Sequence, residues 1–378
     1  MKKEFVSRQQ VNLLPERIRK AEETDANKEL ITYMWKIFKQ NKYFPMNVLV
    51  IGAGSSYPAA VFAKHALQNE LRTPKIEAVT PQTAIRILTQ FDFINNGEWN
   101  PKYDLVIGIS YSGKTQDIKY VSELCDQRGF PFILVTGEEK SEVEKFYFKS
   151  DNMKIISYYN EKDTTGKEKG ILSMASTLIP CIIFDDHWTA KLIPENQKAL
   201  EKGKKFVSEL NIKEIAKSIK ESPIIHVFYE WNTLPTALDI ENKFIQTGIA
   251  NVILHEKKNF SHGHYNTLIN QNFAMIINLT KYYTIIPLVG SKKTSKIYKD
   301  GYDEEVARFL RKISETKQKE YIEIGTPAIM ASQWNIEAMT KIPYLITAID
   351  EELGIDVSKT REKIPEEVKP LFNYKGRF

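Results

Sequence analysis

The fold of this chain is decided by the stretch Ile107-Gly108-Ile109-Ser110-Tyr111-Ser112-Gly113-Lys114-Thr115. It ends an apolar run, Asp104–Ile109, that is typical of a buried parallel strand, and it precedes Gln116–Gln127, which has the pattern of a helix. Three hydroxyl side chains and a glycine therefore lie in a strand-to-helix turn. Because the first N–H groups of a helix have no partner within the helix, such a turn is suited to bind a phosphate.

A second hydroxyl-rich turn lies upstream, at Ile51-Gly52-Ala53-Gly54-Ser55-Ser56-Tyr57, directly after a predicted strand, Asn47–Ile51. Two such turns at strand ends in one α/β unit favour a small phosphorylated ligand. Plain helix capping is the alternative at both turns. One hydroxyl suffices for a cap, so the three hydroxyls of the downstream turn exceed that need.

Size and composition indicate a two-domain protein without a membrane or nucleic-acid partner. The chain has 378 residues, of which 42% are hydrophobic, and its 53 basic and 48 acidic residues are interspersed, as on a solvated surface. No apolar run approaches the roughly 18 residues of a membrane span. The polar N-terminus lacks the apolar core of a signal peptide. The two cysteines, Cys125 and Cys181, lie in apolar contexts, so we expect free thiols and a cytoplasmic location.

Short apolar strands alternate with helices along the first half of the chain, which predicts a parallel sheet covered on both faces. The predicted strands are Asn47–Ile51, Ile76–Val79, Asp104–Ile109, Phe132–Thr136 and Lys154–Tyr158. The predicted helices are Met1–Lys42, Pro58–Glu70, Thr80–Thr89, Gln116–Gln127, Glu142–Tyr147 and Ile171–Trp188, the last with an apolar stripe that indicates core rather than a cofactor site.

A second α/β unit follows a single bridging amphipathic helix predicted at Pro194–Lys220. Its predicted strands are Pro223–Tyr229, Asn251–His255, Phe273–Leu279, Tyr283–Val289 and Tyr321–Ile324, and its predicted helices are Pro235–Thr247, Glu304–Ile313 and Ala328–Glu352. The similar openings of the two units suggest an internal duplication. We therefore expect an N-terminal domain at 1–195, a linking helix at 196–222 and a C-terminal domain at 223–378.

Three motifs together resemble the sugar isomerase (SIS) family. They are the Gly-x-Gly-Ser-Ser-Tyr turn, the Ser-x-Ser-Gly-x-Thr turn and Met174-Ala175-Ser176-Thr177 at a helix start. The resemblance runs from about Val48 to Arg361. Over this range the chain is similar to the double-SIS isomerase part of glucosamine-6-phosphate synthase. It implies two tandem flavodoxin-like units, a homodimer without cofactor, and a sugar phosphate held by Ser55, Ser56, Ser110, Ser112, Thr115 and Ser176.

The resemblance also places possible chemistry in the second half. The family uses a glutamate base and, sixteen residues later, a histidine that opens the sugar ring; His262 matches the histidine, and the glutamate position then falls on Gln246. A carboxamide cannot act as a general base. His264 is therefore the preferred substitute base, because its pKa lies near neutrality, and Asp239 is a further candidate.

The segment His255–Asn266 holds three of the six histidines, which fits a ligand-facing loop, a solvated loop or a metal site. A metal site is disfavoured, because no carboxylate or cysteine lies at useful spacing. The tail from Asp356 to Arg361 resembles a family motif whose reactive lysine would fall on Pro365, two residues from Lys363.

These patterns predict an enzyme that acts at C1/C2 of a sugar phosphate, as an isomerase, a deaminase or a deglycase. The alternative is a non-catalytic regulator that senses a phosphosugar, which Gln246 favours. A nucleotide ligand is a third option, since Tyr57 and Trp231 could stack on a base.

Overall fold

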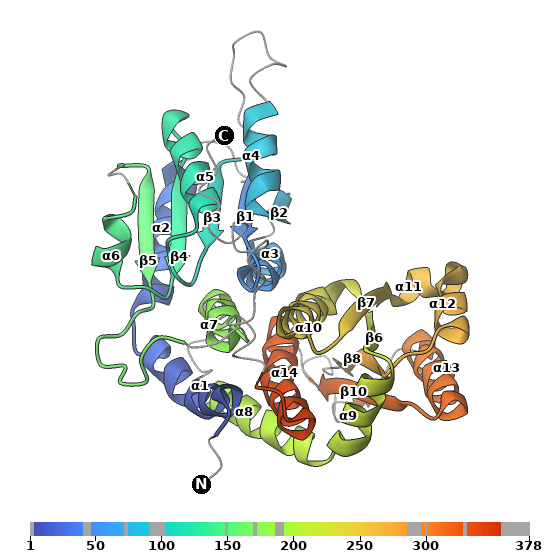
Figure 1. Cartoon of the computed structure of the whole chain (residues 1–378). Helices are drawn as coiled ribbons and strands as arrows, with labels where there is room; N and C mark the ends of the chain where they lie inside the picture. The colour runs from blue at the N-terminus through green and yellow to red at the C-terminus, as the bar shows by residue number, and fades with distance from the viewer. Residues whose placement is uncertain are drawn as a thin grey trace, which may run out of the picture. The chain divides into compact units, whose positions relative to one another are not determined.

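The computed structural model describes residues 4–40, 47–71, 75–90, 103–147, 150–168, 172–185, 193–285, 296–298, 301–327 and 331–356. Within them the chain divides into two compact units, each built on its own β-sheet (Figure 1). The N-terminal unit takes in Leu13–Glu168 and Ser173–Ile193, and the C-terminal unit takes in Met1–Asn12 and Pro194–Glu362, in each case the described residues.

The N-terminal unit contains a five-stranded parallel sheet with the strand order β2-β1-β3-β4-β5. Every residue of β3 and β4 is buried, as expected for central strands of a sheet covered on both faces. All five predicted strands are confirmed to within one residue at each end: β1 (Asn47–Gly52), β2 (Lys75–Val79), β3 (Leu105–Ile109), β4 (Phe132–Thr136) and β5 (Met153–Ser157).

Helices cover both faces of this sheet. One face packs against α2 (Ala26–Gln40), α3 (Ser56–Leu71) and α7 (Met174–Asp185), and the other against α4 (Pro81–Gln90), α5 (Gln116–Gln127) and α6 (Lys140–Glu144). The region Met1–Lys42, predicted to be helical, forms two helices, α1 (Val6–Glu22) and α2. They separate at Thr24, whose hydroxyl donates to the carbonyl of Ala21 and accepts from the N–H of Ala26, so a side chain competes with the helical backbone bonds.

The C-terminal unit repeats the strand pairing of the N-terminal one. Its parallel strands have the order β10-β8-β6-β7, so the first strand of the unit lies between the second and the third, as in the N-terminal sheet. The strands are β6 (Ile224–Tyr229), β7 (Asn251–Glu256), β8 (Met275–Ile285) and β10 (Glu320–Pro327). The shared order of four strands supports the internal duplication that the sequence suggests.

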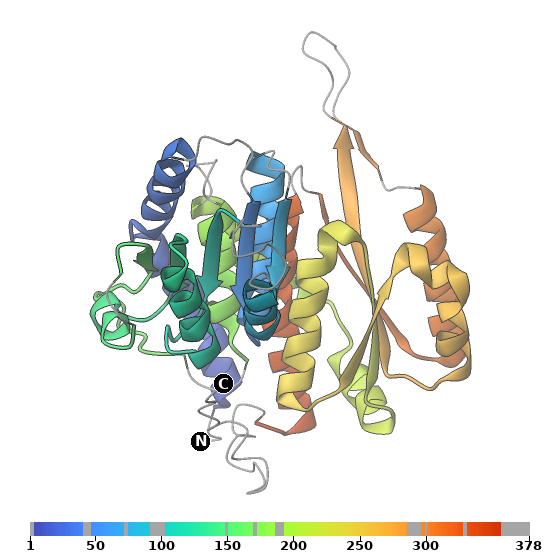
Figure 2. The same cartoon turned by 90° about the horizontal axis from the view of Figure 1, so that it is seen from above.

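β8 is longer than predicted. Phe273–Leu279 and Tyr283–Val289 were expected to be separate strands, but one strand runs through Thr280–Tyr282, residues of mostly high β-propensity that pair with β10. Beyond β10 it pairs antiparallel with β9 (Lys296–Tyr298) and projects from the unit (Figure 2). Residues 286–289 lie outside the described part of the chain.

The helices of the C-terminal unit follow the same layering. α10 (Leu234–Thr247) and α14 (Ala331–Leu353) pack together on one face, and α12 (Tyr265–Asn270) and α13 (Gly301–Lys317) contribute to an apolar cluster on the other. The predicted bridging helix is two helices, α8 (Ile193–Ser208) and α9 (Ile212–Glu221), and Asn211 is the N-cap residue of α9. In the described residues, no helix has both the length and the apolar character needed to cross a membrane.

The turn after β1 requires a glycine at Gly52. A Cβ atom there would meet the carbonyl oxygen of Ser56 and lie 2.7 Å from its carbonyl carbon, so α3 can begin this close to β1 only when residue 52 has no side chain. The backbone of a helix cannot yield as a flexible side chain would.

Replacing Gly52 by alanine should therefore lower the free energy of unfolding of the N-terminal unit by about 3 kcal/mol, as measured by urea denaturation. Gly129→Ala is the matched control, because its Cβ would meet nothing within 4 Å and its φ of +71° alone costs about 1–2 kcal/mol. Equal costs for the two variants would contradict the close approach of β1 and α3.

Candidate functional site

The carboxyl edge of the N-terminal sheet gathers the predicted substrate-binding residues. β1 and β3 are neighbours, with Gly52 paired to Ile109, so the two hydroxyl-rich turns start from adjacent points on this edge. The hydroxyl of Thr177 on α7 donates to the carbonyl of Ser55 at 3.0 Å. The structure thus brings together the segments that hold Ser55, Ser56, Ser110, Ser112, Thr115 and Ser176.

The turn between β3 and α5 is not an ordinary helix cap. Thr115 is the N-cap residue of α5, but its side chain makes no capping hydrogen bond. Its hydroxyl instead lies 2.9 Å from the hydroxyl of Ser110, which is buried, while Ser112 is exposed and accepts a bond from the N–H of Lys114. Gly113 has a φ of +60°, and a Cβ there would lie 2.6 Å from Val143.

A cleft of about 330 Å³ opens at the same edge, within the N-terminal unit. It lies where β3, β4 and β5 end, which is where open parallel sheets bind their ligands. Of the six predicted substrate-binding residues, Ser112 lines this cleft. The remaining lining residues are Arg17, Lys20, Ala21, Tyr111, Gly137, Glu138, Tyr158, Tyr159, Asn160, Asp163, Gly166, Lys167, Glu168, Ala175 and Ile179.

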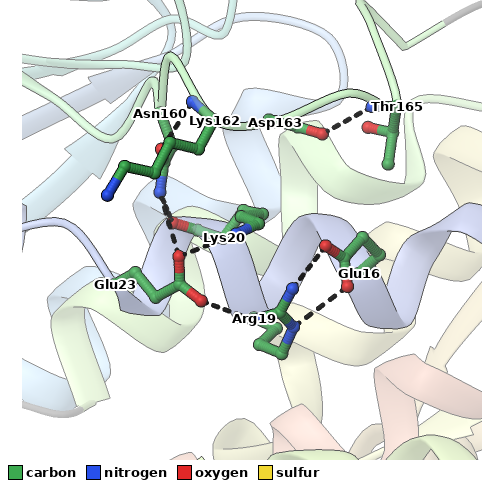
Figure 3. Close-up of polar contacts among 8 residues, drawn as sticks. All are labelled: Glu16, Arg19, Lys20, Glu23, Asn160, Lys162, Asp163 and Thr165. Carbon is green, nitrogen blue, oxygen red and sulfur yellow. Dashed lines mark hydrogen bonds and ion pairs between the residues drawn. The ribbon is translucent and has the colours of Figure 1, made fainter.

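One wall of the cleft joins α1 to the segment that follows β5 (Figure 3). The side-chain amide of Asn160 donates to the carbonyl of Lys20 at 2.8 Å, and the guanidinium of Arg17 donates to the hydroxyl of Thr165 at 3.2 Å. Asp163 accepts from the N–H of Thr165 at 2.8 Å. No sequence motif indicates this wall, since Arg17 and Lys20 stand in no motif and meet residues about 140 positions away.

The charges in the cleft are mixed and largely matched. Lys167 forms an ion pair with Glu138 at 2.6 Å, and Lys20 pairs with Glu23 at 3.0 Å. The carboxylate of Glu168 accepts hydrogen bonds from two backbone N–H groups in the first turn of α7. The cleft therefore offers hydroxyls and paired charges rather than a field of one sign.

Tyrosine rings shape the cleft floor. A Cβ on Gly137 would lie 2.7 Å from the ring of Tyr111 and 2.8 Å from that of Tyr158, so a glycine allows both rings to pack there. Burial raises the pKa of both tyrosine hydroxyls, which keeps them neutral donors.

The residues predicted to be catalytic lie in the C-terminal unit, and the structure does not bring Gln246 and His262 together within one chain. Gln246 is in the last turn of α10, which runs back to the amino edge of the sheet before β7 begins at Asn251. His262 is exposed and follows the carboxyl end of β7. A strand of six residues separates the two positions, which corresponds to about 20 Å.

The other candidates for the base differ in their surroundings. His264 belongs to the same turn, Phe260–His264 (η3), as His262, but its side chain lies outside the described part of the structure. Asp239 is buried and forms an ion pair with Lys243, also buried, one helical turn along α10. Burial with a matched cation is typical of a structural ion pair. Lys363 and Pro365 lie outside the described residues.

The carboxyl edge of the C-terminal sheet has a different chemistry. The ammonium group of buried Lys257 donates to the carbonyl of Leu279 at 2.6 Å and lies 3.1 Å from a carboxylate oxygen of Asp303 and 3.5 Å from one of Glu230. Burial, followed by hydrogen bonding with Asp303, raises the pKa of Glu230 to about 7, although Lys257 opposes the shift. Two carboxylates share one ammonium here, so this edge is unsuited to a phosphate.

Among the described residues there is no group of three or more histidine, cysteine, aspartate or glutamate side chains placed to hold a metal ion. His226 and His255 instead stack in the core, with ring nitrogens 2.8 Å apart. Burial, together with the neighbouring His255, lowers the pKa of His226 to about 3. This histidine pair is structural.

The chain is a double α/β protein, and comparison with solved structures shows the same fold. The chain superposes on the C-terminal domain of glucosamine-fructose-6-phosphate aminotransferase from Francisella tularensis with a TM-score of 0.66 at 14% identity, over 94% of this chain and 98% of that one. Superposition on tagatose-6-phosphate ketose/aldose isomerase from Escherichia coli gives a TM-score of 0.65 at 14% identity, over 92% of this chain and 93% of that one.

Glucosamine-6-phosphate deaminase from Thermotoga maritima gives a TM-score of 0.61 at 15% identity, over 94% of this chain and 96% of that one. No protein-family model matches the sequence, and no curated protein matches it. At these identities the similarity establishes the fold, and the fold is the one that the sequence motifs predict.

The raised pKa of Glu230 predicts an alkaline loss of stability. The unfolded carboxyl, with a pKa near 4.5, loses its proton before the folded one, with a pKa of about 7, so this group's stabilisation is lost as the pH rises between these values. Glu230→Gln, which is always neutral, should match the wild type at pH 4.5 and exceed it by about 1–2 kcal/mol at pH 8 in urea unfolding, after allowance for solvent screening. A constant difference across this pH range would contradict the assignment.

Proposed function

We propose that the N-terminal unit binds a sugar phosphate at the carboxyl edge of its sheet. The observation that carries this proposal is the bonding at Thr115, an N-cap residue whose hydroxyl pairs with Ser110 instead of capping α5. The first N–H groups of α5 are thereby left without a side-chain cap and can donate to a phosphate, together with the exposed hydroxyl of Ser112. The names of the structural neighbours, which include two phosphosugar enzymes, support the same ligand class.

The finer proposal is that the protein acts at C1/C2 of this ligand as an isomerase, deaminase or deglycase. Two carboxylates, Glu138 and Glu168, line the cleft that holds Ser112, and proton transfer at C1/C2 requires such groups. His262 is the residue to which the family resemblance assigns proton donation at the ring oxygen. The family resemblance supports a homodimer, and the two free cysteines fit a cytoplasmic location. No cofactor is proposed.

The second candidate is a regulator that senses the phosphosugar without turnover. It is favoured by the distance along the sheet between Gln246 and His262, which leaves the acid–base pair of the family unassembled within one chain. The two candidates share the phosphate site and differ in whether a proton leaves C2.

Removing the hydroxyl of Ser112 tests the phosphate site. Ser112→Ala should weaken binding of tagatose 6-phosphate or fructose 6-phosphate by about 10- to 100-fold in calorimetry, because it removes a hydrogen bond to a charged group. Ser150→Ala is the control, since Ser150 lies before β5 at the amino edge of the same sheet. Unchanged affinity in Ser112→Ala would refute the proposed site.

Solvent exchange at C2 tests catalysis separately from binding. We expect a sugar phosphate that binds in the cleft to take up deuterium at C2 from heavy water, as followed by proton NMR, and His262→Ala to lower the exchange rate by about 100-fold. Asn259→Ala is the control, because Asn259 is also exposed. His65→Ala is unsuitable because His65 is buried. Binding without exchange in the wild type would favour the regulator.

A further inference from the structure

The cleft of the N-terminal unit contains a carboxylate that is held in one orientation. One oxygen of Glu168 accepts from the N–H of Ala175 at 2.8 Å, and the other accepts from the N–H of Ser176 at 3.1 Å. The backbone N–H of Glu168 donates to the hydroxyl of Tyr111 at 3.2 Å. Each carboxylate oxygen can accept two bonds, so Glu168 retains acceptor capacity beside the cleft that it lines.

Two buried hydroxyls lie next to this carboxylate without hydrogen-bond partners among the described residues. Tyr158 is 4% exposed and lines the cleft, and Ser176 is 3% exposed and follows Ala175 in the first turn of α7. Glu168 is close enough to contribute to the raised pKa of Tyr158, after burial and Tyr111. Leaving a buried hydroxyl unpaired costs about 1–3 kcal/mol and is uncommon in folded proteins.

The hydrogen-bonding capacity of these groups determines which ligand group can satisfy them. Glu168 only accepts hydrogen bonds, whereas the neutral hydroxyl of Tyr158 can donate one. A ligand hydroxyl does both at once, because it donates to the carboxylate and accepts from the tyrosine. A phosphate oxygen only accepts, and its negative charge is repelled by the carboxylate.

The basic side chains of the cleft do not reverse this preference. Lys167 is paired with Glu138, Lys20 is paired with Glu23, and Arg17 donates to Thr165 and to the carbonyl of Gly166. The charges of the two lysines are therefore matched by carboxylates before a ligand enters, and the guanidinium of Arg17 is engaged by two neutral oxygens of the cleft wall.

We propose that Glu168 and Tyr158 bind a hydroxyl of the ligand and determine its specificity for polyol phosphates over simple phosphates. This inference rests on the proposed function, because it needs the phosphate to be held by the turn that contains Ser112. The two parts of the cleft then bind different parts of the ligand. The turn after β3 binds the phosphate, and the segment between β5 and α7 binds a hydroxyl of the sugar.

Tyr158→Phe is the sharpest test, because the hydroxyl makes no internal hydrogen bond whose loss would unfold the protein. We expect about tenfold weaker calorimetric binding of fructose 6-phosphate and tagatose 6-phosphate, with unchanged binding of inorganic phosphate. Tyr147→Phe is the matched control: Tyr147 is also buried with an unpaired hydroxyl, in the same unit, and is not among the residues that line the cleft.

Glu168→Gln adds a second, independent readout. The amide keeps the size of the side chain and removes its charge, so binding of fructose 6-phosphate should fall while binding of inorganic phosphate rises about threefold or more. A purely structural role in capping α7 would lower both affinities together.

The outcomes separate this inference from the proposed function. If Ser112→Ala loses the sugar phosphates but Tyr158→Phe binds them as the wild type does, the hydroxyl site is refuted and the phosphate site stands. An equal loss of sugar phosphate and inorganic phosphate in Tyr158→Phe also refutes it. If the wild type binds none of these probes, the proposed function fails and this inference fails with it.

Discussion

The parallel pairing of β1 with β3 is the constraint on which the candidate site depends. Both strands are central, and all but the first residue of β1 and every residue of β3 are buried, so the packing of apolar side chains fixes their register. That register sets Gly52 opposite Ile109, and each residue is followed at once by a polar turn. The hydroxyls at the sheet edge are thus positioned by the core beneath them, and Gly52 lets the first turn approach α3 closely.

The two units show that one strand order can support two kinds of edge. In the N-terminal unit the carboxyl edge has small hydroxyls, free helix N–H groups and a cleft, which together suit an anion. In the C-terminal unit the corresponding edge holds Glu230, Lys257 and Asp303, in which two carboxylates share one buried ammonium. Burying that cluster stabilises only if its charges are matched internally, so the edge has no spare positive charge for a phosphate. The proposed phosphate site therefore has no counterpart at the corresponding edge of the C-terminal sheet.

The sequence predicted the parts of the molecule that depend on local pattern. The five strands of the first sheet are short apolar runs bounded by polar turns. The Ser-x-Ser-Gly-x-Thr turn can be recognised from a stretch of nine residues. Local pattern also explains the errors, since nothing in the alternation of residues shows that β8 continues through Thr280–Tyr282 or that Asn211 starts a new helix.

The rest of the site depends on contacts between distant segments and could not be predicted in this way. Arg17 and Lys20 reach the cleft because α1 is bonded to Asn160 and Thr165, and neither end of these bonds has a motif. The sixteen-residue spacing between Gln246 and His262 also says nothing of the helix and strand that separate them along the chain. The cluster of histidines in His255–Asn266 was also misleading in part, because His255 stacks on Phe228 in the core at a ring separation of 4.8 Å.

Buried hydroxyls without hydrogen-bond partners indicate a binding site only where several of them lie close together. A single one, such as that of Tyr147 in the core, has no functional implication, since folded proteins tolerate a few unsatisfied polar groups. Around Glu168 two of them lie beside a carboxylate with remaining acceptor capacity, and one of the two lines a cleft. If only packing mattered at these positions, phenylalanine and alanine would fill the same space without the cost of desolvation. The retained hydroxyls are consistent with a site that stays incomplete until a ligand with both a donor and an acceptor enters it.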